Sequence, residues 1–257
     1  MHYLFGPMDE QLARDFDTHM FSRYREKRLK GEYARSNRTK EVSSRTLNLE
    51  LAYFRAVFNE LNRLGEWKGE TPLKNIRPFR TEEMEMAWLT HDQISLLLGE
   101  CKRHEHNDLE TVVRICLATG ARCSETESLR KSQLAKYKII YTNTKSRKNC
   151  TVPISKKLYQ SLLDNKKDRL FSDCYGAFRP ALERTGIELP AGQLTHVLCH
   201  TLASHFMMNG GNILVLQRVL GHTDIKMTMR YTHFAPNHLE DAVKLHPLNC
   251  KFVKEEA

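Results

Sequence analysis

Residues 194–234 read LTHVLCHTLASHFMMNGGNILVLQRVLGHTDIKMTMRYTHF, and two helical patterns follow each other in this stretch. The first stops at the pair Gly210-Gly211, and the second is an apolar run that begins at Asn212. Gly221 ends that run, because glycine commonly terminates helices. The stretch therefore predicts two short helices joined by a glycine turn, and the rest of the chain is expected to be arranged around them.

Polar side chains suited to chemistry accompany these two helices. These side chains, and Arg122 in the separate segment ATGARCSE, belong to residue types that can bind a phosphate group beside helix ends. They are His196, Cys199 and His200 on adjacent turns of the first helix, His222 directly after the second, and Tyr231 nine residues later.

The charge of the chain favours a polyanionic partner. Its 257 residues include 40 Lys and Arg against 31 Asp and Glu, which gives a net charge of +9. Nine basic residues fall within residues 21–45, and residues 136–148 contain five basic residues and no acidic one. Either cluster alone also fits an ordinary solvated face, but the surplus as a whole favours nucleic acid.

Seven cysteines and the absence of long apolar runs indicate the compartment. The odd count, with no CxxC pair, argues against a disulfide framework and for a reducing interior. No apolar run approaches the roughly 20 residues needed to span a bilayer, and the start of the chain lacks a signal-peptide layout. A cytoplasmic protein with no membrane partner is expected.

The domain organisation follows from a change in composition. Residues 9–33 and 43–64 have helical patterns, whereas the following stretch contains Pro72 and Pro78, which disfavour helix. We therefore expect a small helical domain over residues 1–66, a linker over 67–87, a main domain over 88–240 and a tail over 241–257.

The main domain is predicted to be mainly α with a small antiparallel β-sheet or hairpin. Two β-rich runs flank a basic tip and predict the hairpin, and the other segments have helical patterns. The predicted strands are 138–143 and 149–154, and the predicted helices are 90–103, 108–119, 156–165 and 174–185, with a short amphipathic one over 236–248.

Each candidate residue also has an ordinary structural interpretation. An arginine at the position of Arg122 is more often a surface ion-pair partner, although its planar fork suits two phosphate oxygens. Lys145, at the hairpin tip, also fits a solvated turn lysine. Tyr231, with an ordinary pKa near 10, is a poor nucleophile unless cations or a base assist it.

Three metal-ligand types on one helix face keep a zinc site open as an alternative. His196 and His200 are four residues apart, and Cys199 lies between them. No HEXXH or paired CxxC pattern accompanies them, and a fourth ligand would have to come from elsewhere. A zinc-stabilised helical protein is therefore the least favoured interpretation, and no metal or other cofactor is expected.

Five motifs in a fixed order carry a more specific signal. ATGARCSETESL, TNTKSRKNCTVPI, the HxxCHT helix followed by GG, then LGH, and finally RYTHF resemble the catalytic domain of tyrosine recombinases. The sequences of these motifs are most similar to those of integrases of temperate tailed phages. The resemblance covers about residues 88–240, and the basic helices before them resemble that family's core-DNA-binding domain.

The resemblance implies a function and a role for each residue. Tyr231 would attack a DNA phosphate, forming a 3′-phosphotyrosyl link, and strand exchange would pass through a four-way junction without ATP or metal. Arg122 would stabilise charge on phosphorus, Lys145 would protonate the leaving 5′ oxygen, and His196 and His222 would supply hydrogen bonds and proton transfer. Glu125 and His200 would have supporting positions.

One position breaks the family pattern. The family has a second arginine three residues after His196, where this chain has Cys199. A thiol cannot make the bidentate, charged contact, and losing one such donor typically costs about 2.7 to 4 kcal/mol of transition-state stabilisation. We therefore expect DNA binding to survive and cleavage to be weakened, which leaves a catalytically inactive DNA-binding remnant as the alternative function.

The expected partners also follow from the resemblance. They are double-stranded DNA at attachment sites, further copies of the chain in a tetramer on paired sites, and accessory DNA-bending proteins. Such integrases usually carry a further amino-terminal domain, and the stretch before Asp9 has no room for it, so a fragment or a shortened protein is expected. The predicted DNA contacts are Arg23, Arg25, Lys27, Arg28, Arg35, Arg38, Lys40, Arg45, Arg147 and Lys148.

Overall fold

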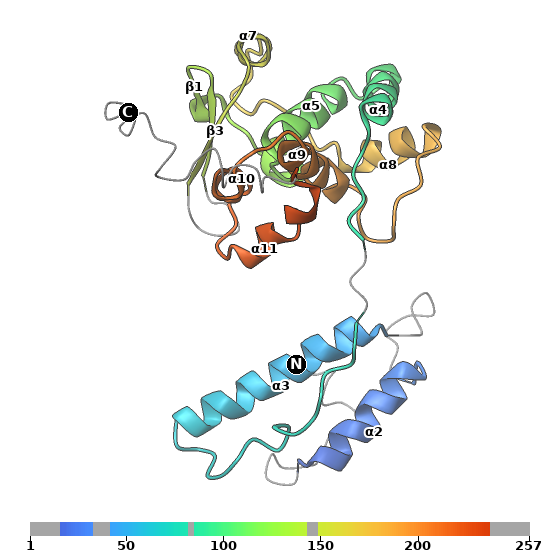
Figure 1. Cartoon of the computed structure of the whole chain (residues 1–257), viewed down its shortest axis with the longest axis vertical. Helices are drawn as coiled ribbons and strands as arrows, with labels where there is room; N and C mark the ends of the chain where they lie inside the picture. Colours follow the sequence, from blue (N-terminus) through green and yellow to red (C-terminus); the bar gives the residue numbers. More distant parts are fainter. Residues whose placement is uncertain (1–15, 33–41, 82–84, 143–148, 237–257) are drawn as a thin grey trace, which may run out of the picture. The chain divides into compact units, whose positions relative to one another are not determined.

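The chain divides into two units, Met1–Glu83 and Met84–Ala257. Figure 1, a view of the computed structural model, shows that both are built mainly from helices and that a small sheet belongs to the second. The mainly helical fold with a small antiparallel sheet, expected from the sequence, is thereby confirmed. The structure describes residues 16–32, 42–81, 85–142 and 149–236.

Two helices of the first unit begin at side-chain caps. Helix α2 spans Thr18–Leu29, and the Asp17 carboxylate accepts a hydrogen bond of 2.7 Å from the backbone N–H three residues on. Helix α3 spans Ser44–Arg63 and is capped in the same way by the Ser43 hydroxyl, at 3.3 Å. Such caps satisfy N–H groups that lack a partner inside the helix. Both helices were predicted from the sequence, and residues 9–15 and 33 of the first predicted range lie outside the described residues.

An aromatic cluster fills the space between α2 and α3. The rings of Phe16 and Phe54 stack with their centroids 5.3 Å apart, and the apolar side chains of Leu73 and Ile76 pack into the same cluster. Trp67, Leu73 and Ile76, which lie in the predicted linker, therefore pack into the core of the first unit. The prolines of this stretch disfavour a helix but do not prevent neighbouring apolar residues from being buried.

A buried carboxylate ties α2 to α3. Glu50 of α3 is 8% exposed, and its two oxygens accept hydrogen bonds from Arg28 at 2.7 Å and from the Tyr24 hydroxyl at 3.1 Å. A buried charge is tolerated when it is paired and hydrogen-bonded, as the Glu50 carboxylate is in this cluster. Burial and the charge of Glu50 raise the pKa of Tyr24, so its hydroxyl remains a donor.

The second unit contains a central group of helices and the sheet. Its helices begin with α4, where the Thr90 hydroxyl and the Gln93 side chain form a reciprocal capping box. The helices are α4 His91–Arg103, α5 Leu109–Thr119, α6 Cys123–Glu127, α7 Lys156–Leu163, α8 Tyr175–Arg184, α9 His196–Met208, α10 Ile213–Leu220 and α11 Lys226–Met229, with 3-10 turns η3 Lys131–Gln133 and η4 Thr232–Phe234.

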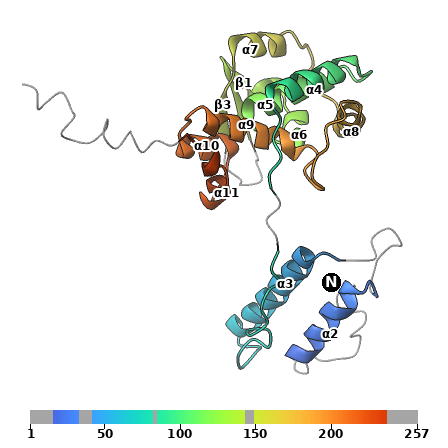
Figure 2. The same ribbon diagram turned by 45° about the vertical axis from the view of Figure 1, so that its right-hand side comes forward.

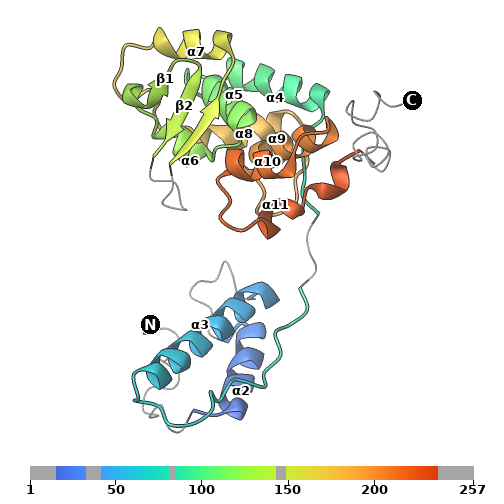
Figure 3. The same cartoon turned by 60° about the vertical axis from the view of Figure 1, so that its left-hand side comes forward.

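The sheet has three antiparallel strands in the order β1-β2-β3. Strand β2, Lys138–Tyr141, pairs with β3, Cys150–Pro153, so that buried Ile139 faces buried Val152. Figure 3 shows the sheet at one side of the helices, next to α7. The predicted hairpin is confirmed as this strand pair, whereas β1, Leu134–Ala135, was not predicted because it is too short to give an alternating pattern.

Helix α9 lies at the centre of the second unit. Figure 1 and Figure 2 show it between α5 and α10, and it packs closely against both. Val197, Leu198 and Ala203 of α9 are fully buried. The Thr201 hydroxyl, also on α9, accepts a hydrogen bond of 2.9 Å from the backbone N–H of Leu89. The core therefore fixes α9, while His196 at its start is exposed and Cys199 and His200 are half-buried.

Two glycines end the helices that flank α9. Gly120 closes α5 with φ 69° and Gly221 closes α10 with φ 65°, a left-handed conformation that costs other residues energy. A Cβ added at Gly120 would lie 2.7 Å from Leu220 Cδ2 and 2.8 Å from Leu202 Cδ2. Glycine at position 120 is therefore required twice, by its backbone conformation and by the close approach of α9 and α10.

The remaining differences from the predicted elements involve short segments. The helices α6 and α11 and the turn η4 have five residues or fewer, which is too short for a helical pattern to be recognised. The predicted tail helix over 236–248 and the hairpin tip over 143–148 lie outside the described residues, apart from residue 236. Among the residues described, no helix combines the length and the apolar character needed to cross a membrane.

We predict that Gly120→Ala lowers the free energy of unfolding by about 1 to 3 kcal/mol, because it adds left-handed strain and a clash in a packed region. Chemical denaturation of the purified chain, followed by circular dichroism, measures this change.

Gly99→Ala is the matched control. Gly99 lies inside α4, and a Cβ added to it meets nothing within 4 Å. Because alanine is the better helix former, this variant is expected to be more stable than the parent by up to about 1 kcal/mol. Equal stability of the two variants would contradict the role given to Gly120.

Candidate active site

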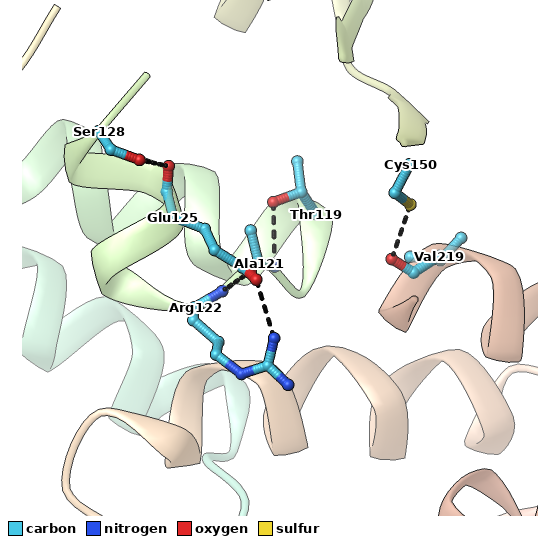
Figure 4. Close-up of polar contacts among 7 residues, drawn as sticks. All are labelled: Thr119, Ala121, Arg122, Glu125, Ser128, Cys150 and Val219. Carbon is cyan, nitrogen blue, oxygen red and sulfur yellow. Dashed lines mark hydrogen bonds and ion pairs between the residues drawn. The ribbon is translucent and has the colours of Figure 1, made fainter. Parts of the chain in front are cut away.

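Arg122 stands at the start of α6, two residues after the glycine turn that ends α5. Its Nη1 donates a hydrogen bond of 2.8 Å to Glu125 Oε1, and its backbone N–H donates one of 3.0 Å to Oε2, as Figure 4 shows. The side chain is 38% exposed. Among the described residues, its guanidinium donates to Glu125. Glu125 therefore fixes the guanidinium and leaves other N–H groups for a ligand.

A pocket of about 240 Å³ lies beside this arginine. Arg122, Glu125 and His222 form part of its wall, which also includes the turns at Gly120 and Gly221. The pocket thus gathers groups from the end of α5, the start of α6 and the end of α10. Bulky side chains at the two glycines would narrow it, so the same turns that end the helices leave room for a ligand near the guanidinium.

His222 contributes an imidazole to the pocket. Its Nδ1 lies 2.9 Å from the Thr228 hydroxyl, a hydrogen bond that leaves Nε2 as the nitrogen facing other partners. Burial, and secondarily the positive charge of Arg122, lowers the pKa of His222. The ring is therefore neutral at neutral pH and is available for hydrogen bonding to a bound anion.

Cys199 lies on α9, between the two histidines at the start of that helix. Its sulfur lies 3.1 Å from the backbone oxygen of His196, the next turn back. Burial raises the pKa of Cys199 to about 11, although the charge of Arg122 partly opposes this shift. The side chain is thus a neutral thiol that donates within its own helix, and it adds no positive charge to the site.

Tyr231 is also held by α9. Its hydroxyl lies 2.7 Å from His200 Nδ1, and the side chain is 3% exposed. Burial raises the pKa of Tyr231, while burial and the neighbouring His196, Arg230 and His222 lower the pKa of His200 to about 4. Both groups are therefore neutral at neutral pH, and a hydrogen bond between two neutral groups joins them.

The zinc alternative finds no geometry to support it. Among the residues that the structure describes, no group of three or more His, Cys, Asp or Glu is arranged to hold a metal ion. The ring centroids of His196 and His200 are 6.4 Å apart, and Nδ1 of His200 is hydrogen-bonded to Tyr231.

The predicted DNA contacts of the first unit divide into two groups. Arg28 is held by Glu50, and the Arg25 guanidinium lies 3.7 Å from the centre of the Phe79 ring, so both stabilise the unit itself. Arg23 and Arg45 are exposed, and Lys27 is about half exposed beside Glu32. The other predicted site residues, Lys145, Arg35, Arg38, Lys40, Arg147 and Lys148, lie outside the described residues.

Several residues of the site were not singled out in the sequence. Thr228 holds His222, and Cys150 of β3 lines the pocket while its sulfur lies 3.1 Å from the Arg218 backbone oxygen of α10. Tyr141 reaches the pocket from β2. A threonine or a cysteine in such positions has no distinctive local pattern. Only the three-dimensional contacts identify these residues.

Comparison with known proteins gives the family. A model described as the phage integrase family matches residues 87–238, and one described as the phage integrase amino-terminal domain matches residues 1–80. The first match alone includes more than half of the chain.

Individual relatives agree with this assignment. The integrase of Escherichia phage 186 is 87% identical over 248 residues, covering 96% of this chain and 74% of the relative. The integrase of Haemophilus phage HP1 is 55% identical, covering 92% of this chain and 70% of the relative.

Solved structures agree as well. The catalytic domain of bacteriophage HP1 integrase is 61% identical, with a TM-score of 0.61, covering 64% of this chain and 97% of that structure. The Tn1549 transposon integrase, at 18% identity and a TM-score of 0.72 over 94% of this chain and 90% of that one, shares the fold. With its two family matches and these close relatives, the chain belongs to the phage integrase family of tyrosine recombinases.

Proposed function

We propose that this chain cuts and rejoins double-stranded DNA at attachment sites, with Tyr231 as the nucleophile and the pocket beside Arg122 as the phosphate site. The observation that carries the proposal is the sharing of one pocket by Arg122 and His222, which come from distant parts of the chain. A fixed guanidinium and a neutral imidazole on one wall suit a phosphodiester, which has one negative charge and several acceptor oxygens.

Arg122 is assigned to charge stabilisation. As the attacking oxygen approaches phosphorus, negative charge grows on the non-bridging oxygens, and donors already aimed at them lower the barrier. Glu125 accepts one hydrogen bond from the guanidinium and one from the backbone N–H of Arg122, which holds the side chain and limits its reorganisation during the reaction. His222, neutral in the resting site, is assigned to a hydrogen bond on the same oxygens.

Tyr231 is assigned to the covalent step. Its oxygen forms a bond to phosphorus while the bond from phosphorus to the 5′ oxygen breaks, and the phenol proton passes to a base, for which the family resemblance suggests His196 or His222. The departing 5′ oxygen takes up a proton, for which the family resemblance suggests Lys145. His196, exposed at the start of α9, is assigned to hydrogen bonding with the phosphate. The phosphotyrosyl link keeps the phosphoester bond, so the reverse reaction rejoins the strand without ATP.

DNA is supported as the partner by the charge of the chain and by its structural relatives. Solved relatives include the Tn1549 transposon integrase in complex with circular intermediate DNA and the XerH recombinase bound to difH substrate. On this chain, the exposed Arg23 and Arg45 remain the candidates for backbone contacts among the described residues of the first unit. We also propose a tetramer on paired sites, accessory DNA-bending proteins and action in the bacterial cytoplasm.

A DNA-binding protein without cleavage is the second candidate, and Cys199 is the observation that favours it. The neutral thiol at this position hydrogen-bonds within α9 and offers no charge-assisted donor to a phosphate. Binding to DNA depends mainly on other basic residues and would survive, whereas the chemical step would lose one of its stabilising contacts.

A nicked duplex that carries the attachment core of Escherichia phage 186 tests the proposed function. The nick lets the cleaved strand end diffuse away, so a covalent protein–DNA adduct accumulates and is visible on a denaturing gel. We expect a slow, protease-sensitive adduct with the parent chain and none with Tyr231→Phe, which keeps the ring but lacks the attacking oxygen. A shift on a native gel that falls with salt, without any adduct, would favour the binding protein instead.

Replacing Cys199 measures what the thiol costs. We predict that Cys199→Arg raises the initial rate of adduct formation at least about tenfold, because it adds a bidentate cationic donor to the phosphate site. The time course on the same nicked duplex, at saturating protein, provides this rate.

Two matched variants separate charge from geometry at position 199. Cys199→Lys, which adds charge without the planar fork, is expected to give a smaller gain, and Cys199→Ser, which adds neither, no gain. An adduct rate that is the same for Cys199→Arg and Cys199→Ser would show that the thiol is not what limits cleavage.

A further inference from the structure

The contact between Tyr231 and His200 joins the nucleophile of the proposed function to a residue whose role has no assignment. The hydroxyl oxygen and His200 Nδ1 are 2.7 Å apart, and the two ring centroids are 6.0 Å apart at an angle of 44°. This geometry is that of a direct hydrogen bond, not of ring stacking. The two residues are 31 positions apart, so the bond depends on the tertiary fold.

One face of α9 fixes the whole tyrosine side chain. The ring of Tyr231 packs with Ala203 and Met207 of that helix and with Leu216 of α10. His200 lies on the same face, one turn before Ala203. Packing therefore determines where the ring lies, and the imidazole determines in which direction the hydroxyl proton points.

A second connection holds the segment that carries the tyrosine. The backbone N–H of Tyr231 donates a hydrogen bond of 3.0 Å to the Thr228 carbonyl, and the Thr228 hydroxyl bonds to His222 Nδ1 at 2.9 Å. The phenol is thus linked through Thr228 to an imidazole of the phosphate pocket. These links hold the hydroxyl at a defined place relative to that pocket.

We propose that His200 is the positioning residue of the nucleophile: its Nδ1 accepts the phenol proton in a hydrogen bond and so turns the lone pairs of the Tyr231 oxygen toward the phosphate. This inference rests on the proposed function. A nucleophile reacts fastest when its lone pair is held on the line of attack, and free rotation about the C–O bond of the phenol would disperse it.

The same contact argues against His200 as the base that removes the proton in the resting enzyme. His200 has a pKa of about 4, and burial raises that of Tyr231 above its ordinary value near 10. The neutral pair is therefore favoured over the ion pair by at least about a millionfold. The groups that oppose protonation of His200 are His196 on its own helix, Arg230 beside the tyrosine and His222 after α10.

Two substitutions distinguish positioning from proton removal. In His200→Asn the amide oxygen occupies nearly the place of Nδ1, so it still accepts the hydrogen bond but has no basicity. In His200→Phe the ring volume stays and the acceptor is lost. We expect His200→Phe to form the Tyr231 adduct at least about tenfold more slowly than the parent, and His200→Asn to stay within about threefold of it.

The measurement uses the nicked phage 186 duplex, single-turnover conditions and a pH series from 5 to 9, with the parent and Cys199→Arg chains as backgrounds. The parent and His200→Asn should share one pH profile, since His200 is neutral throughout this range. DNA affinity and the thermal unfolding midpoint of His200→Phe are measured in parallel, and both should match the parent.

Exposed His91 provides the control, because His91→Phe should leave the adduct rate unchanged.

The outcomes are separable. If His200→Asn is as slow as His200→Phe, or its pH profile differs from that of the parent, His200 removes the proton and the positioning role is overturned. If His200→Phe reacts as fast as the parent, the hydrogen bond is not used in the reaction and the inference is wrong although the proposed function stands. If neither background forms a Tyr231-dependent adduct, the proposed function fails, and the inference fails with it.

Discussion

The packing of α9 between α5 and α10 is the constraint on which the second unit depends. Six of its residues are buried, so the helix can neither rotate nor slide without opening the core. The packing consequently fixes the directions of His196, Cys199 and His200. The turn at Gly120 also depends on this packing, because a leucine from α9 and one from α10 lie against it and leave no space for a Cβ.

The chemistry of the site follows from how far each group is removed from water. Burial keeps His200 and His222 neutral, keeps Tyr231 protonated and keeps Cys199 a thiol. Arg122 is the exception, since its side chain remains partly exposed and is held by a carboxylate. Among the described residues, the resting site therefore combines the oriented guanidinium of Arg122 with neutral hydrogen-bonding groups, which suits the binding of a singly charged phosphodiester.

The sequence predicts the longer elements of this fold because their signals are local. Helix α3 has a serine cap and apolar residues at helical spacing, α4 has a capping box, and α5 ends at a glycine. Short elements such as α6 have no such signal, and they form because the neighbouring structure holds their ends. The burial of Leu73 and Ile76 has no local signal for a related reason, since prolines indicate the absence of a helix and not the absence of packing.

The sequence indicates candidate residues of the site better than it indicates the contacts between them. The spacing of the motifs pointed to Arg122 and His222, which line one pocket, whereas the bond from Tyr231 to His200 needs two elements that only the tertiary fold brings together. Lys145 and the basic residues of the hairpin tip remain predictions.

Thr228 connects two groups of the candidate site. Its hydroxyl holds Nδ1 of His222, and its carbonyl holds the backbone of Tyr231, so one fully buried side chain belongs to both connections. The positions of the His222 imidazole and the Tyr231 phenol are therefore coupled through Thr228. A movement that carries the tyrosine segment and Thr228 away from the pocket would also break the hydrogen bond to His222, so both groups would lose their positions together.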